Sequence, residues 1–131
     1  MRRATFILVL LAACLAQGQN KKPQLKEAEI QVFEPVVRRD DNLITIDAML
    51  RNVGEKPARK LAVIYEVLDS DKNVLTRQKG DIEGRDLDPG EDADVNSQMA
   101  FHARAVQVRL SFEDGSGRDL RGINAGPYTI E

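Results

Sequence analysis

Cysteine, histidine and long apolar runs are all scarce in this chain of 131 residues. Cys14 is the only cysteine, so no disulfide can form within the chain, which excludes the class of secreted modules stapled by disulfides. His102 is the only histidine, and no G-x-S-x-G motif accompanies it, so a serine or cysteine triad finds no support. No apolar run approaches the ~20 residues of a membrane-spanning helix, and single domains commonly have about 100–150 residues. The chain therefore has room for one folded domain.

An excess of basic residues is also lacking, since 19 lysines and arginines stand against 21 aspartates and glutamates. The two signs are mixed along the chain, and no basic stripe is present to neutralise the phosphates on which nucleic-acid binding depends. Apolar residues at spacings of three and four, which indicate amphipathic helices, are nearly absent too. We therefore expect no nucleic-acid partner and very little helix.

The start of the chain has the order of segments that is typical of a secretory signal. Two arginines precede an apolar run over residues 6–16, and small and polar residues follow it. Ala16 and Gly18 predict a signal peptide over residues 1–18, with the mature chain beginning at Gln19. The sequence LAAC at residues 11–14 resembles the lipobox of bacterial lipoproteins, which implies instead a leader of residues 1–13 and a lipid on Cys14. Both alternatives predict export to the periplasm or the exterior, with membrane anchoring only through that lipid.

Alternating apolar residues dominate the rest of the chain. Residues 19–27 are polar and contain a proline, so we predict a flexible tether there and one folded domain over residues 28–131. Within the domain, apolar side chains recur at every second position in short segments, at spacings of about 8–12 residues with turn-forming residues between them, which indicates an all-β fold. We expect the first strand to end at or bend around Pro35, and the charged segment at residues 38–42 to form a turn.

The pattern contains about seven strands. Each strand has one apolar face to bury, which predicts an immunoglobulin-like antiparallel β-sandwich. Residues 61–68 are apolar on both faces and are expected in the middle of a sheet, whereas the polar residues 73–81 are expected at an edge. Period two assigns the faces of the strands. The side chains expected to be buried are Ile44, Ile46, Leu50, Val63, Tyr65, Val67, Val106, Val108, Leu110 and Phe112, and those expected to be more exposed are Thr45, Asp47, Gln107 and Arg109.

Three short motifs between residues 44 and 112 resemble one known family. They are LRNVGEKP at residues 50–57, YEVLD at residues 65–69 and LDPGE at residues 87–91. In this order and spacing they resemble the FxLYD domains of bacterial envelope proteins, although Tyr65 stands where that family has phenylalanine and Leu68 where it has tyrosine. The resemblance implies a small extracytoplasmic β-sandwich with no established catalytic residues, and it transfers no site to this chain.

The segment DSDKN at residues 69–73 has two interpretations. Asp69, Asp71 and Asn73 match the first three ligands of an EF-hand calcium loop, but Val74 replaces the glycine of its sixth position and Gly80 the glutamate of its twelfth. Aspartate and asparagine also favour β-turns, because their side chains bond the backbone two residues on. We therefore predict that the segment is the bend of a hairpin.

Two further groups of polar residues are weaker candidates for metal binding. Five carboxylates surround a proline-glycine turn, and we favour a solvated turn over a weak cation site. They are Asp86, Asp88, Glu91, Asp92 and Asp94. Met99 and His102 are a candidate copper pair, but in an extended strand they point to opposite faces, and we expect His102 to be exposed at a strand end. We predict no catalytic residue, no cofactor and no metal ligand, so Cys14 is the only candidate for modification, by a lipid.

These observations predict a non-catalytic binding or structural module, exported by a bacterium, whose partner is an unknown protein or envelope component. The competing hypothesis is a metal-binding or enzyme-associated periplasmic protein. A binding module would use its loops or a sheet edge, and the polar segment at residues 73–81 is the best candidate for pairing with a strand of the partner. Arg77 and Lys79 also favour the simpler interpretation of an edge that charges protect from pairing.

Overall fold

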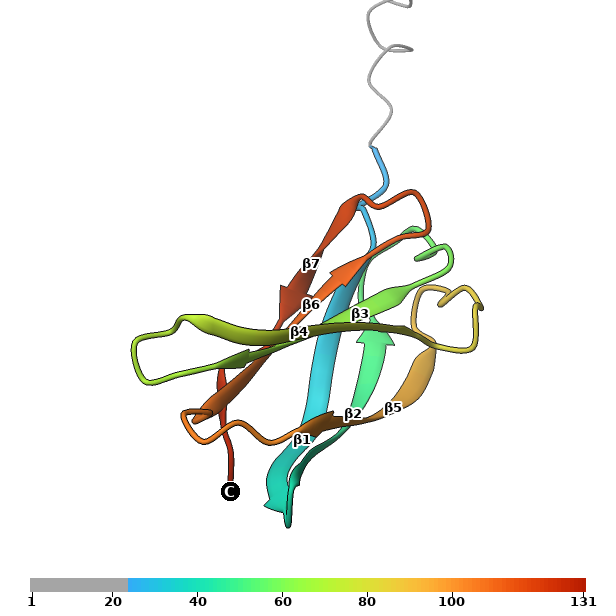
Figure 1. Cartoon of the computed structure of the whole chain (residues 1–131). Coiled ribbons are helices and arrows are strands. Elements are labelled where there is room, and N and C mark those ends of the chain that lie inside the picture. The colour runs from blue at the N-terminus through green and yellow to red at the C-terminus, as the bar shows by residue number, and fades with distance from the viewer. Residues whose placement is uncertain (1–23) are drawn as a thin grey trace, which may run out of the picture.

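The structure is a computed structural model that describes residues 24–131 (Figure 1). The eight strands in these residues are β1 (Glu29–Asp40), β2 (Leu43–Asn52), β3 (Ala62–Leu68), β4 (Val74–Asp81), β5 (Asp92–Ala100), β6 (Gln107–Glu113), β7 (Asp119–Ile123) and β8 (Tyr128–Thr129). Residues 24–131 contain no helix, so none of them forms a helix that is long and apolar enough to cross a membrane. The all-β prediction is confirmed, while the predicted signal peptide and Cys14 lie outside the described residues.

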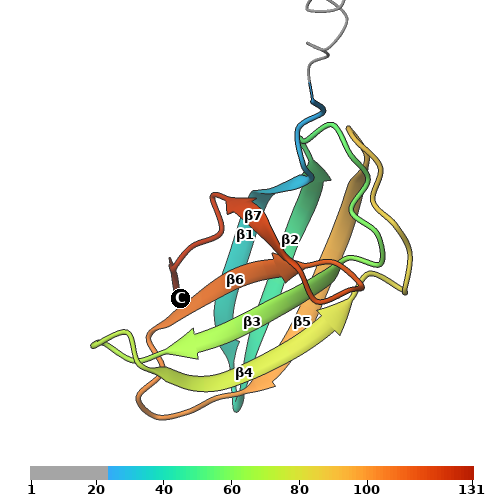
Figure 2. The ribbon, with the colours of Figure 1, turned by 90° about the horizontal axis from the view of Figure 1, so that it is seen from above.

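All eight strands belong to one mixed sheet that curls back on itself. Its order is β4-β3-β6-β7-β1-β2-β5, and β8 pairs with β6. Figure 2 shows β3, β4 and β6 lying across β1, β2 and β5, and apolar side chains from both groups form one core cluster. Between the two ends of the path, Gln78 Nε2 of β4 donates a hydrogen bond to Ser97 Oγ of β5 at 2.9 Å. The sheet is thus nearly closed, and its open side lies between β4 and β5.

Two features of this sheet differ from the sequence prediction. A purely antiparallel arrangement is wrong, because β1 and β7 run parallel, with Glu29 beside Arg121. Only strands joined by a short turn must run antiparallel, and these two strands lie near opposite ends of the domain sequence. The strand count is eight instead of about seven, because the chain turns between β7 and β8 through Asn124, with φ of 57°, and Gly126, with φ of 103°.

Strand β1 continues past Pro35 and does not end there. A register shift after Phe33 leaves Glu34 and Pro35 opposite Ala48 of β2, which makes a β-bulge, and Glu34 takes a positive φ of 49°. The strand then extends to Asp40, so the turn predicted at residues 38–42 shrinks to residues 41–42. The bulge bends the strand and lets the proline stay in it without breaking the ladder.

The predicted faces of the strands are confirmed with two exceptions. Nine of the ten side chains expected in the core are buried, but Val106 is 39% exposed. Val106 precedes β6, so it lies beyond the end of the core that β6 covers. Thr45 is buried although period two places it on the outer face, because the long side chains of Arg38 in β1 and Gln98 in β5 flank it in the sheet. Asp47, Gln107 and Arg109 are half-buried.

One buried polar side chain, that of Asn52, holds the end of β2. Its Oδ1 accepts hydrogen bonds from the main-chain N–H groups of Gly54, at 3.0 Å, and Glu29, at 3.4 Å. Its Nδ2 donates to the carbonyl oxygens of Lys56, at 2.8 Å, and Leu87, at 3.0 Å. Asn52 thereby joins the start of β1, the β2–β3 loop and the turn before β5.

The described part of the predicted tether, residues 24–27, contains no strand and contacts the β2–β3 loop. The main-chain N–H of Lys26 donates to Glu55 Oε1 at 2.9 Å, and the N–H of Glu55 donates to the Lys26 carbonyl at 3.0 Å. A Cβ added to Gly54 would lie 2.1 Å from the carbonyl oxygen of Glu27. Glycine at this position therefore allows the two backbones to touch.

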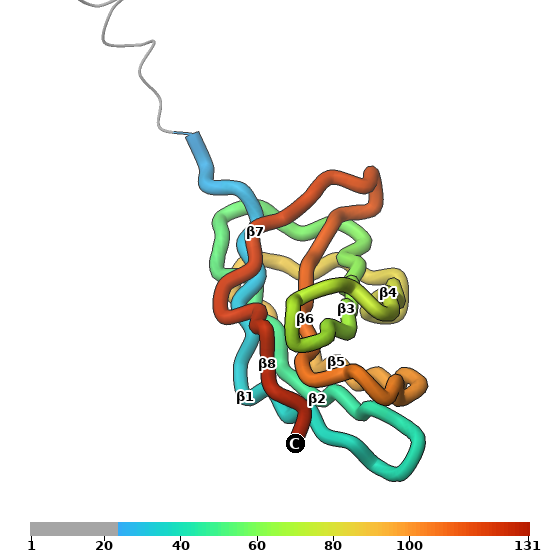
Figure 3. Tube along the Cα trace, turned by 60° about the vertical axis from the view of Figure 1, so that its left-hand side comes forward, coloured from blue at the N-terminus to red at the C-terminus, as the bar shows by residue number. Residues whose placement is uncertain are grey.

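The last residues of the chain connect β6 to β1 on the side of the molecule away from the β4–β5 opening (Figure 3). The N–H of Ile130 donates to the Val106 carbonyl at 3.0 Å. Glu131 pairs with β1, donating to Val37 at 3.0 Å and accepting from the N–H of Arg39 at 2.8 Å. These main-chain bonds cover one potential opening of the sheet, so the β4–β5 side is the one left without main-chain pairing in residues 24–131.

Candidate functional site

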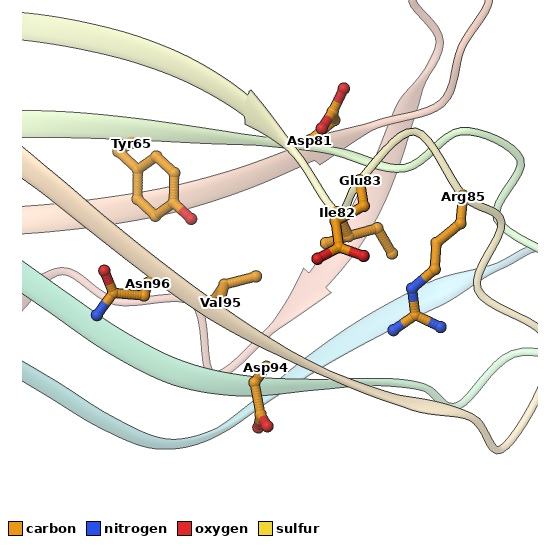
Figure 4. A pocket seen from close by; sticks show the side chains of 8 residues that line it. All are labelled: Tyr65, Asp81, Ile82, Glu83, Arg85, Asp94, Val95 and Asn96. Carbon is orange, nitrogen blue, oxygen red and sulfur yellow. The ribbon is translucent and has the colours of Figure 1, made fainter.

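A cleft of about 460 Å³ lies at the open side of the sheet, where β4 ends and the chain turns away toward β5 (Figure 4). Strands β3, β4 and β5 and the segment after β4 all contribute to it. Its lining residues are Tyr65, Asp81, Ile82, Glu83, Arg85, Asp94, Val95 and Asn96.

The cleft exists because the inner face of β4 carries small and polar side chains. Thr76, Gln78 and Gly80 are the β4 residues that pair with the inward-facing positions of β3. Gly80 has no side chain, and a Cβ placed on it would meet only the Tyr65 ring, at 3.9 Å. The apolar core therefore stops at Tyr65, and the space between the two edge strands is left to polar groups.

Tyr65 forms the floor of the cleft. The residue is only 4% exposed, and burial raises the pKa of its hydroxyl to about 12, so the group is neutral at physiological pH. Figure 4 shows the hydroxyl turned toward the side of the cleft that holds Ile82 and Glu83. No group within residues 24–131 forms a hydrogen bond with it. The ring is buried, but the hydroxyl oxygen is accessible, because no buried side-chain nitrogen or oxygen atom in residues 24–131 lacks a hydrogen-bond partner. A hydroxyl that opens into a cleft with free donor and acceptor capacity is suited to binding a polar ligand.

The charged residues make the cleft negative. Asp81, Glu83 and Asp94 are exposed, and none of the three forms an ion pair or hydrogen bond with the described residues. Arg85 is the cation of the lining, and its Nη1 lies 3.8 Å from Glu91 Oε2, so its charge is already partly compensated. The lining contains no serine, cysteine, histidine or lysine, and its ionisable groups are the Tyr65 hydroxyl, the three carboxylates and Arg85.

The DSDKN segment is the bend of the β3–β4 hairpin, as predicted. Asp69 Oδ1 accepts hydrogen bonds from the main-chain N–H groups of Asp71 and Asn73, both at 2.9 Å, and Oδ2 accepts one from the Asn73 side chain at 3.2 Å. The bond from the Asn73 main chain is the largest of the contacts that lower the pKa of Asp69. The carboxylate thus closes the turn, with Lys72 at a positive φ of 65°.

The five carboxylates around the proline-glycine turn are not gathered at one point. Asp86 accepts a hydrogen bond from the Lys60 N–H at 2.9 Å. Asp92 pairs with Arg51 at 2.6 Å, and Glu91 accepts from the Asp88 N–H at 3.1 Å. Of these five carboxylates, Asp94 is the one that lines the cleft. In the part of the chain that the structure describes, no three histidine, cysteine, aspartate or glutamate side chains are placed to hold a metal ion.

Met99 and His102 lie apart in the structure. Met99 is in the core at 3% exposure, while His102 follows the end of β5 and lies in the loop to β6. The expectation of an exposed histidine is wrong, because the side chain is half-buried and its Nδ1 accepts a hydrogen bond from the Arg104 N–H at 3.1 Å. The histidine therefore stabilises a turn.

Sequence reasoning missed the cleft, although it placed Tyr65 in the core. Ile82, Glu83 and Arg85 belong to no strand and to none of the motifs, so they gave no signal of their own. The available signal was the inner face of β4, where residues 76, 78 and 80 are too small or polar to complete a core.

No protein-family model and no curated protein matches the chain. Among solved structures, the chain is similar to the ApaA protein from Bordetella pertussis, with 16% identity, a TM-score of 0.46, and coverage of 72% of this chain and 87% of that one. The chain is also similar to IrmA from Escherichia coli, with 11% identity, a TM-score of 0.44, and coverage of 82% of this chain and 99% of IrmA. A β-glucosidase from Kluyveromyces marxianus matches with 18% identity and a TM-score of 0.40, and the match covers 74% of this chain but only 13% of the enzyme. At these values the matches carry no assignment of function.

Proposed function

We propose that this chain is an exported, non-catalytic binding module of the bacterial envelope or exterior, built on an immunoglobulin-like sandwich related to FxLYD domains. Two antiparallel groups of strands support the sandwich. One is β5-β2-β1 and the other is β4-β3-β6, and β7 joins them by pairing with both β6 and β1. The signal-like first residues support export.

The observation that carries the proposal is the unpaired edge of β4. This strand pairs with β3 alone, and it ends the strand path within residues 24–131. An extended segment of a partner protein would add to this edge, taking affinity from main-chain hydrogen bonds and specificity from alternate side chains. Such a segment would run along the open side of the sheet and reach the cleft beside Asp81.

Edge protection by charge is weaker here than the sequence alone indicates. Lys79 forms an ion pair with Glu113 of β6, so its ammonium is held across β3 over the outer face of the sheet. Only Arg77 then remains to discourage pairing along the middle of β4. By comparison, the opening between β6 and β1 is filled by the chain's own last residues. These contacts favour a functional edge over a merely protected one.

Site-specific photo-crosslinking in the native bacterium tests the proposal. A photoreactive amino acid replaces Arg77 in one variant and Asp119, an exposed residue of β7, in the matched control. We expect a discrete adduct with an envelope or extracellular protein from position 77 and none from position 119. Equal adducts from both positions, or no adduct from position 77, would contradict recognition at β4.

Intact-mass analysis of the mature chain tests export in the same cells. We expect a chain that begins at Gln19 or a lipid-modified chain that begins at Cys14. A chain that retains residues 1–18 unprocessed would contradict the proposed location.

A further inference from the structure

The cleft holds two sets of polar groups that have no partner in the described residues. Three carboxylates, those of Asp81, Glu83 and Asp94, lie around it without an ion pair. Independently of them, the Tyr65 hydroxyl is directed into the cleft from a side chain that is 96% buried, and nothing in residues 24–131 bonds to it. The hydroxyl oxygen itself reaches the surface of the cleft, because no buried side-chain nitrogen or oxygen atom in residues 24–131 lacks a hydrogen-bond partner. It is therefore free to accept a hydrogen bond from a ligand that enters the cleft.

We propose that the cleft receives a basic side chain, lysine or arginine, of the partner segment that pairs with β4. This inference rests on the proposed function and adds to it the chemistry of one partner residue. The net charge of the lining selects a cation, because three carboxylates stand against Arg85, and Arg85 already faces Glu91.

The residues of the cleft match the two parts of such a side chain. Its aliphatic stem packs on Ile82 and Val95, which are both buried apolar residues. Its charged end donates a hydrogen bond to the Tyr65 hydroxyl oxygen and lies in the field of Glu83. Asp81 and Asp94 lie on opposite sides of the cleft in Figure 4, and the Asp94 carboxylate points away from the Tyr65 hydroxyl, so these two side chains act only from the rim. An acidic side chain would meet the same carboxylates and be rejected.

A titration of the full mature chain with blocked single amino acids tests this inference. The probes are N-acetyl-lysine N-methylamide and its norleucine analogue, which keeps the aliphatic chain and lacks the ammonium group. Nuclear magnetic resonance follows the main-chain amides of Gly84 and Val95. We expect the lysine probe to bind at least fivefold more tightly than the norleucine probe. Equal affinities, or no binding of the lysine probe, would overturn the inference.

Variants separate the two recognition elements from a general surface effect. Glu83→Gln and Tyr65→Phe should each weaken the lysine probe at least threefold and leave the norleucine probe unchanged. Asp119→Asn, which removes an exposed carboxylate on β7, should change neither. Tyr65→Phe keeps the ring in the core, and an unchanged unfolding midpoint verifies that the fold is intact. An affinity for the lysine probe that neither Glu83→Gln nor Tyr65→Phe changes would contradict the inference.

Failure here is distinguishable from failure of the proposed function. A single blocked amino acid cannot add a strand to β4, so its binding does not depend on edge pairing. Lysine binding without adducts at position 77 would support the cleft as a site for a basic side chain and would refute recognition at the β4 edge. Adducts at position 77 with no preference for the lysine probe would support recognition at the β4 edge and would refute binding of a basic side chain in the cleft.

Discussion

Replacing Asn52 with alanine should be among the most destabilising single changes in the domain. The side chain satisfies four main-chain groups, and three of the bonds are buried: those to Gly54 and Leu87, both at 3.0 Å, and a longer one to Glu29 at 3.4 Å. A buried main-chain group that loses its partner costs about 1–3 kcal/mol, so the groups of Gly54 and Leu87 together give a loss of about 4 kcal/mol. The long buried bond from Glu29 and the part-buried bond to Lys56 add smaller amounts to this loss.

Equilibrium unfolding in urea measures this loss, with fluorescence or circular dichroism as the probe. Asn42→Ala is the matched control, because Asn42 is exposed in the β1–β2 turn and no described group bonds to its side chain. We expect the control to stay within about 0.5 kcal/mol of the parent protein. If Asn52→Ala loses less than about 1 kcal/mol at an unchanged m-value, Asn52 does not join the three segments as inferred.

Three further predictions concern the core, a backbone contact and a turn. Leu110→Ala should cost about 2–5 kcal/mol in urea unfolding and Val106→Ala under about 1 kcal/mol, so equal losses would contradict the assigned faces. Gly54→Ala should lower the melting temperature far more than Gly80→Ala, because a Cβ at position 54 would lie 2.1 Å from the Glu27 carbonyl oxygen. Similar melting temperatures for the two variants would show that the backbone at residue 27 moves away without cost. The lowered pKa of Asp69 contributes stability that is complete above the ordinary carboxyl pKa of 3.8 and is lost as the pH falls below that value. Asp69→Asn should therefore reduce the dependence of the unfolding free energy on pH in the acidic range. Parallel curves for the parent and the variant would exclude this contribution.

The strands could be predicted from the sequence because burial of one face leaves a local trace. In β2, Ile44 and Ile46 alternate with polar residues, and the same period appears in β5 and β6. The pairing of β1 with β7 and of Glu131 with Val37 has no such trace, because it joins segments from opposite ends of the domain. The sequence also predicts correctly that β4 is an edge and β3 a central strand, and it fails only for pairings between segments that are distant in the chain.

The candidate site was less predictable for a related reason. Tyr65 has the position of a core residue, and its burial is confirmed. Whether its hydroxyl meets another side chain or a cleft depends on what lies across from it, and that is decided by the meeting of β4 and β5. The role of Asp69 could be predicted from the sequence, because the turn that it closes lies within five residues of the chain.

Amide hydrogen exchange on β4 tests most directly whether a partner adds a strand there. The mature chain is compared alone and in complex with the protein captured at position 77. Because the amides of an edge strand point alternately toward β3 and outward, we predict slower exchange at alternate residues of β4 in the complex, with little change at the amides bonded to β3. Unchanged exchange throughout β4, together with protection elsewhere in the domain, would contradict recognition at this edge.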